Sequence, residues 1–179
     1  MLMPIVIALA VIIVVFVIVV ALQPADFRIT RKTAISAPPS LVFAQVNDLH
    51  QWEAWSPWAK LDPEAKMTYE GPSAGEGASY AWFGNNQVGE GRMTITGSRP
   101  SDRIGLRLEF VRLFKATNAV EFTFRPEGNQ TAATWSMTGQ NNFMAKAFGL
   151  FVNCDKMVGG QFETGLAQMK AVSEAAAGK

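Results

Sequence analysis

The sequence predicts an α+β domain in which an antiparallel sheet of about seven strands packs against one long C-terminal helix, behind an N-terminal membrane helix. Three observations predict this arrangement. Residues 5–22 are an unbroken apolar run, residues 67–139 alternate apolar and polar side chains in short segments, and residues 154–172 return to helical spacing. Turn residues separate the alternating segments, which indicates consecutive strands joined by short connections.

Length and composition exclude several classes of protein. The chain has 179 residues and a net charge of +1, so it fits one ordinary domain and offers no basic stripe for nucleic acid. A single Cys excludes an internal disulfide, and one Cys with one His excludes zinc fingers and His/Cys metal clusters. A metal site built from carboxylates alone has no motif here, and no metal or cofactor is predicted.

The apolar run Ile5–Leu22 is long enough to cross a bilayer, and no charged side chain precedes Asp26. A cleaved signal peptide is the alternative, but the segment has neither a basic start nor an Ala-x-Ala-like site before the domain. We therefore expect a retained anchor and linker in residues 1–25 and one domain in residues 26–179.

Basic residues follow the apolar run and none precedes it. The three nearest are Arg28, Arg31 and Lys32. Because basic residues flank membrane helices on the cytoplasmic side, the positive-inside rule predicts that residues 26–179 lie on the cytoplasmic side of the inner (cytoplasmic) membrane. One free Cys suits either compartment, so a periplasmic domain is the open alternative.

The domain begins with a strand at residues 27–35, in which Arg31 falls on the apolar side. Ala37-Pro38-Pro39 ends this strand, and Ser40 is expected to cap a short helix through Val46. A second short helical segment carries three tryptophans before prolines end it: Trp52, Trp55 and Trp58. These rings are expected either to frame the mouth of a pocket or to plug the end of the sheet.

Six further strands are predicted, at residues 67–70, 79–83, 88–96, 103–110, 117–125 and 131–139, with a turn at residues 126–129. Short connections imply an antiparallel meander. The last segment is an amphipathic helix whose apolar stripe runs from Cys154 to Val172. Gly159, Gly160 and Gly165 lie in or beside that stripe, which indicates either close packing on the sheet or space for a cavity.

Several local motifs resemble those of a known superfamily: Ile35-Ser36-Ala37-Pro38-Pro39, Asn47-Asp48-Leu49, Trp55-Ser56-Pro57-Trp58, Lys156-Met157-Val158-Gly159 and Phe162-Glu163-Thr164-Gly165-Leu166. With the order of elements, they resemble the START-like (SRPBCC, Bet v 1-like) superfamily, and specifically bacterial polyketide cyclase/dehydrase-like proteins. The resemblance covers about Phe27 to Ala175. It implies a helix-grip fold, in which a curved antiparallel sheet wraps around the long C-terminal helix and two short helices follow the first strand.

A strongly curved sheet cannot touch a straight helix along its whole length, so this fold makes a ligand cavity possible. The residues expected to line it are apolar or small side chains on the inward phase, together with one amide; each has ordinary core packing as its alternative. They are Trp82, Phe110, Asn118, Phe122, Phe124, Trp135, Met137, Met157, Phe162, Gly165 and Met169, with Phe143 as a further candidate.

No catalytic residue is assigned from the sequence. His50 is the only imidazole and has no Ser-His-Asp context, while a Cys154–His50 dyad is not excluded by composition. Cyclases of the resembled family assist enolisation with a few polar groups, for which Arg31, Tyr69, Tyr80 and Asn118 are the possible counterparts here. Nothing in the sequence predicts the oligomeric state.

The predicted function is a membrane-tethered domain that binds or transports a hydrophobic small molecule, lipid-like or aromatic polyketide-like. Its partners are then that molecule and, through residues 5–22, the membrane. One alternative is a polyketide cyclase/dehydratase-type enzyme, although the missing catalytic constellation favours a protein without enzymatic activity. Another is an envelope interaction module whose pocket has closed.

Overall fold

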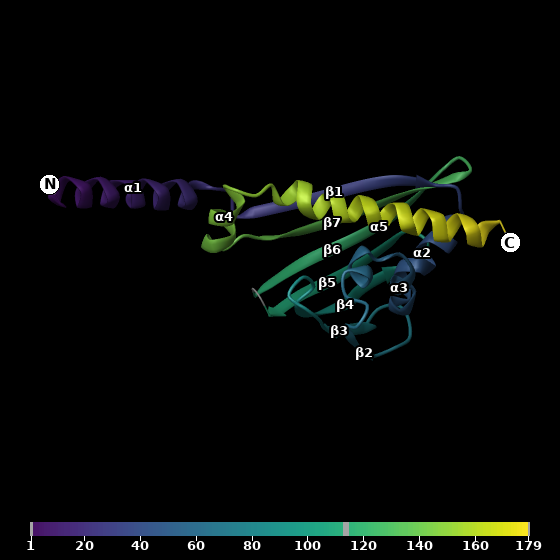
Figure 1. Ribbon diagram of the computed structural model, residues 1–179. Coiled ribbons are helices and arrows are strands. Elements are labelled where there is room, and N and C mark those ends of the chain that lie inside the picture. The colour runs from purple at the N-terminus through teal and green to yellow at the C-terminus, as the bar shows by residue number, and fades with distance from the viewer. Residues whose placement is uncertain (1, 113–114, 179) are drawn as a thin grey trace.

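The computed structural model describes residues 2–112 and 115–178, and it shows one seven-stranded antiparallel sheet, one long C-terminal helix and an N-terminal helix that projects from the domain (Figure 1). The strands lie in the order β1-β7-β6-β5-β4-β3-β2, so the first strand pairs with the last and the other six form a meander. This architecture confirms the predicted α+β helix-grip fold.

The strands follow the predicted alternation with small shifts at their ends: β1 Asp26–Ile35, β2 Lys66–Glu70, β3 Ser79–Phe83, β4 Glu90–Arg99, β5 Arg103–Arg112, β6 Ala116–Glu127 and β7 Gln130–Gln140. The turn predicted at residues 126–129 is too long, because Pro126 and Glu127 still pair with β7. The pairing of β5 with β6 stops at Thr123, so Pro126 needs a partner on one side only, where a missing N–H is tolerated.

The helices are α1 Leu2–Leu22, α2 Pro39–Asn47, η1 Leu49–Gln51, α3 Trp52–Trp55, η2 Pro57–Lys60, α4 Phe143–Gly149 and α5 Cys154–Ala177. Helix α2 begins one residue before Ser40, and Pro38 precedes it without a side-chain cap, so the predicted Ser40 cap is wrong. A proline suits the first turn of a helix because its missing N–H has no helical partner there. Helix α4 was not predicted; Asn142 caps it by accepting a hydrogen bond from the Ala145 N–H at 2.9 Å.

The core lies between the inner face of the sheet and the layer formed by α2, α3 and α5. The inward strand residues are the predicted ones, including Ile104, Leu106, Val120, Phe122, Phe124, Trp135 and Met137, all buried. Helix α5 packs along β1 and touches α2 and α3.

Arg31 of β1 fastens the first turns of α5 to the edge of the sheet. Its guanidinium donates to Glu163 at 2.6 Å and to Asp155 at 2.9 Å. Gly159 lies directly under it, and a side chain there would collide with the guanidinium group. The arginine predicted on the apolar side of the strand is therefore satisfied by two carboxylates of the helix, and the glycine makes room for it.

Helix α1 is long and apolar enough to be a candidate membrane span, since Met3–Leu22 has a mean hydropathy of 3.8. Its described side chains are exposed except for Val20, which is fully buried. The last turns of α1 pack on α4, so α1 meets the domain at its α4 end (Figure 1).

Candidate functional site

The predicted ligand-lining residues divide into two groups along the inner face of the sheet. One group, on β6, β7 and α5, is packed, with exposed fractions of 0–2% for the ring and Met side chains: Phe122, Phe124, Trp135, Phe162 and Met169. Trp135 stacks on Phe162 with ring centroids 4.1 Å apart and planes inclined by 7°. Side chains therefore fill the space between sheet and helix at this level.

The tryptophans after β1 seal this packed region. The indole N–H groups of Trp52 and Trp55 donate to backbone carbonyls, at 3.0 Å to Val46 and 2.9 Å to Gln45. Trp58 packs edge-on against Trp135, with ring centroids 5.7 Å apart. Of the two expected roles, the rings of Trp52 and Trp55 serve as the plug.

One polar atom inside the packed region has no partner. The Nε1 atom of Trp135 is buried, and no described residue accepts its hydrogen. An unmet buried donor costs about 1–3 kcal/mol, so an acceptor oxygen on a ligand or a water would be stabilised here. The indole N–H groups of Trp52 and Trp55, by contrast, both have backbone acceptors.

The second group lies at the end of the sheet nearest α1 and is less covered. Trp82 and Phe110 are half-buried and form an edge-to-face pair with centroids 5.9 Å apart. Asn118 and Met137 are each 7% exposed, and the Asn118 amide oxygen occupies the space that a side chain at Gly139 would need. The inner face is thus buried at Asn118 and Met137 and only half-buried at Trp82 and Phe110.

Two predicted lining residues point elsewhere. Met157 is 53% exposed, and Phe143, in α4, is 45% exposed. Met157 precedes Val158 of the buried stripe, and one residue along a helix turns the side chain by about 100°. Met157 therefore faces solvent rather than the sheet.

Of the four polar residues considered as cyclase counterparts, Tyr69 and Tyr80 are neighbours across β2 and β3, with ring centroids 6.0 Å apart, whereas Asn118 and Arg31 lie on other strands. Tyr80 and Asn118 share a row across the sheet but are separated by β4 and β5. Burial raises the pKa of the Tyr80 hydroxyl, so it stays protonated at neutral pH. Arg31, on β1, is held by two carboxylates of α5.

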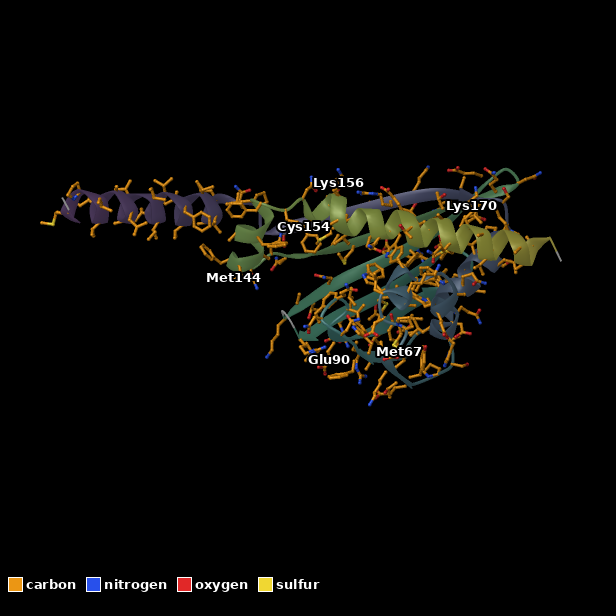
Figure 2. All side chains as sticks on the ribbon, in the orientation of Figure 1. Met67, Glu90, Met144, Cys154, Lys156 and Lys170 are labelled. Atoms are coloured by element: carbon orange, nitrogen blue, oxygen red, sulfur yellow. The ribbon has the colours of Figure 1, made fainter. Side chains whose placement is uncertain are left out.

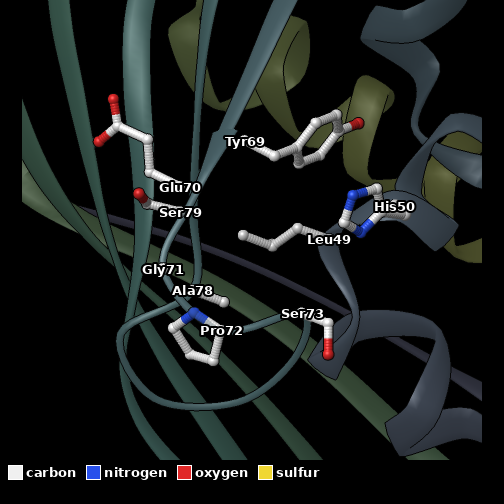
Figure 3. A pocket seen from close by; sticks show the side chains of 9 residues that line it. All are labelled: Leu49, His50, Tyr69, Glu70, Gly71, Pro72, Ser73, Ala78 and Ser79. Carbon is white, nitrogen blue, oxygen red and sulfur yellow. The ribbon is translucent and has the colours of Figure 1, made fainter.

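A small pocket of about 70 Å³ lies beside η1 (Figure 3), lined by Leu49, His50, Tyr69, Glu70, Gly71, Pro72, Ser73, Ala78 and Ser79. The rings of His50 and Tyr69 stack with centroids 4.0 Å apart. The His50 Nδ1 atom lies 3.0 Å from a carboxylate oxygen of Asp48. Burial alone would raise the pKa of Asp48, but hydrogen bonds from the His50 backbone and ring outweigh it and lower the pKa.

This pocket holds water-sized molecules rather than a lipid, since ligand sites usually reach about 300–1,000 Å³. Sequence analysis did not find the Asp48–His50 pair, although an Asp two residues before a His at a helix start is its signal. The Cys154–His50 dyad that composition left open does not form. His50 lines this small pocket, whereas Cys154 lines a second, separate hollow.

That second hollow is an open groove of about 530 Å³ between the end of α1, α4 and the start of α5. It is lined by Gln23, Pro24, Asp26, Asn141, Ala145, Lys146, Gly149, Leu150, Phe151, Val152, Asn153 and Cys154. Figure 2 shows Met144 and Cys154 at this end of the domain. In the sequence, this groove is marked only by the Phe and Met residues clustered at 143–151. These residues do not form a helical stripe.

A curved antiparallel sheet gripping a C-terminal helix, with an aromatic inner face, defines the START-like (SRPBCC) class of ligand-binding domains. Residues 26–174 match the family model described as polyketide cyclase / dehydrase and lipid transport, and the chain belongs to this family. Family membership supports a domain that binds hydrophobic ligands.

Solved structures show the same fold at low sequence identity. Protein CV1439 from Chromobacterium violaceum is 15% identical, with a TM-score of 0.59 over 85% of this chain and 99% of that one. TTHA0849 from Thermus thermophilus is 14% identical, with a TM-score of 0.61 over 84% and 99% of the two chains. The di-domain aromatase/cyclase StfQ from the steffimycin biosynthetic pathway is 12% identical, with a TM-score of 0.62 over 87% of this chain and 53% of that one. No curated protein matches the sequence.

Proposed function

We propose that the protein is a membrane-tethered domain that binds a lipophilic small molecule, lipid-like or aromatic polyketide-like, on the inner face of its sheet. Residues 1–25 serve as anchor and linker, and residues 26–179 form the binding domain on the cytoplasmic side of the inner membrane. The observation that carries this proposal is the uneven cover of the aromatic inner face. Its side chains are buried beneath the tryptophan plug and only half-buried at Trp82 and Phe110.

The strand register supports entry of the ligand from the α1 end. Leu108 pairs with Asn118, whose amide packs on Gly139, and Gly139 pairs with Phe27 at the start of β1. Phe110 lies two residues beyond Leu108 in the direction of the anchor. An apolar molecule that enters at this end of the strands would therefore reach the half-buried aromatic pair on β3 and β5.

The anchor contributes through proximity. A poorly soluble molecule is concentrated in the bilayer, and holding the domain at that surface raises the effective concentration of the ligand without any new contact. The unpartnered Trp135 N–H supports a ligand that carries an oxygen acceptor, reached when the packed region opens to admit it.

Photocrosslinking tests this function on the full chain reconstituted in lipid vesicles. A fatty acid bearing a diazirine group is added, and the crosslinked residues are mapped by mass spectrometry. We expect crosslinks on the inner face at Trp82 and Phe110 besides those in α1. Phe110→Asp should reduce the inner-face crosslinks tenfold or more, because a carboxylate opposes an apolar ligand.

The matched control is Val111→Asp, since neighbouring strand residues point to opposite faces and Val111 is 54% exposed. It should leave the inner-face crosslinks unchanged. Crosslinks confined to α1 and α4 would contradict ligand binding. They would favour a second candidate, an interaction module with a closed interior, to which the Trp135–Phe162 stack already lends weight.

A further inference from the structure

We propose that α4 and the residues after it form a second membrane contact, which dips into the surface of the same bilayer that α1 enters. This inference rests on the proposed function, because it requires α1 to be in the membrane. The surface concerned, called here the α4 patch, consists of Phe143, Met144, Phe148, Leu150 and Phe151, with exposed fractions of 45%, 73%, 53%, 37% and 80%.

The exposure of the α4 patch is unusual for a water-facing surface. Single exposed apolar side chains are normal, but neighbouring ones mark an interaction site. Phe148 and Phe151 alone leave most of two aromatic rings in water. Removing apolar surface from water is favourable by about 25 cal/mol per Å², so a hydrocarbon environment would stabilise this surface.

The position of the patch identifies the bilayer as the occupant. Val20 in the last turns of α1 is fully buried where α1 packs on α4. Gln23 and Pro24, immediately after α1, line the same groove as Leu150 and Phe151. At 1.5 Å per residue α1 is about 31 Å long, which matches a hydrocarbon core of about 30 Å. The end of α1, and with it the patch, then lies at the membrane surface.

The charges around the patch suit a lipid surface with anionic headgroups. Lys146 lies within α4, and Lys156 is exposed in the first turns of α5 (Figure 2). The acidic groups at this end have donors of their own: Asp26 accepts from Gln140, and Asp155 pairs with Arg31. Lysines beside exposed aromatic rings bury their aliphatic stems and keep the ammonium groups among headgroups.

Two side-chain caps hold the patch in place. Asn142 accepts from the Ala145 N–H at the start of α4, and Asn153 accepts from the Lys156 N–H at the start of α5, both at 2.9 Å. The backbone on either side of residues 143–151 is therefore fixed by hydrogen bonds. A fixed surface loses less conformational freedom on contact with lipid than a flexible one does.

Spin-label accessibility tests the inference on the full chain in phosphatidylethanolamine/phosphatidylglycerol vesicles. Single cysteines are placed in a Cys154→Ser background: Phe151→Cys in the patch, Ile12→Cys within α1, and Ala176→Cys at the far end of α5. Labels in lipid collide with dissolved oxygen, whereas labels in water collide with a soluble nickel chelate. We expect the oxygen-to-nickel ratio at positions 12 and 151 to exceed that at position 176 several-fold.

The three positions separate the two proposals. A water-like ratio at 151 with a lipid-like ratio at 12 would overturn the α4 contact and leave the anchor intact. Low collision rates with both reagents at 151 would also overturn it, because they indicate that a protein covers the patch. A water-like ratio at 12 would contradict the anchor itself, and the membrane contact of α4 with it.

Discussion

Gly165 of α5 lies against the indole ring of Trp135 of β7, so closely that a Cβ atom on the glycine would stand 2.9 Å from Cζ3 of the tryptophan. The same Cβ would stand 3.0 Å from Cδ of Pro57. Of the two sequence-based interpretations, close approach of helix and sheet describes this glycine. It permits the Trp135–Phe162 stack that fills the interior at this level.

Gly165→Ala should therefore destabilise the fold, because the methyl group must displace an aromatic ring and a proline. Overpacking of this kind costs about 1–3 kcal/mol. Gly160→Ala is the matched control on the same helix, since a Cβ there meets nothing within 4 Å. It should stabilise the protein by about 0.4–1 kcal/mol through higher helix propensity. Urea unfolding compares the two variants, and equal midpoints would contradict this packing.

The Arg31–Asp155 pair should make the free energy of unfolding depend on pH in the acid range. Hydrogen bonding from Arg31 lowers the pKa of Asp155 in the folded protein, against a smaller opposing effect of burial. The ion pair stabilises the fold fully at pH values above the unfolded-state pKa of Asp155, about 3.9. This stabilisation is lost as the pH falls through the lower pKa that Asp155 has in the folded protein.

Arg31→Gln should consequently flatten the decrease in unfolding free energy below about pH 4. The control is Arg28→Gln, because Arg28 donates to Thr30 rather than to a carboxylate. Unfolding curves recorded from pH 7 to pH 2.5 check the slopes. Parallel curves for wild type and Arg31→Gln would show that the pair does not contribute.

The domain should lie on the cytoplasmic side of the inner membrane, because Arg28, Arg31 and Lys32 follow α1. Ser73 is exposed, so Ser73→Cys in a Cys154→Ser background offers a thiol for labelling. In cells with a permeabilised outer layer, a membrane-impermeant maleimide should label it only after the inner membrane is opened. Labelling before that step would place the domain in the periplasm.

The strands and α5 were predictable from the sequence, because alternation and helical spacing report which side chains face a core. Phe122 and Trp135 pair across β6 and β7 as that alternation requires. The filled interior was not predictable, since Gly165 marks either space or contact until the distance from helix to sheet is known. Helix α4 was also missed, because its Phe143 and Phe148 do not face the core and leave no periodic signal.

Native mass spectrometry of the full chain, released from detergent after mild purification, tests the binding of an apolar molecule most directly. We expect a species heavier than the 19.5 kDa chain, whose added mass is recovered in organic extract as one lipid or aromatic compound per chain. Reloading that compound onto stripped protein should raise the melting temperature. A chain that carries no such compound, and whose melting temperature does not respond to lipids, fatty acids or aromatic polyketides, would contradict the proposed function.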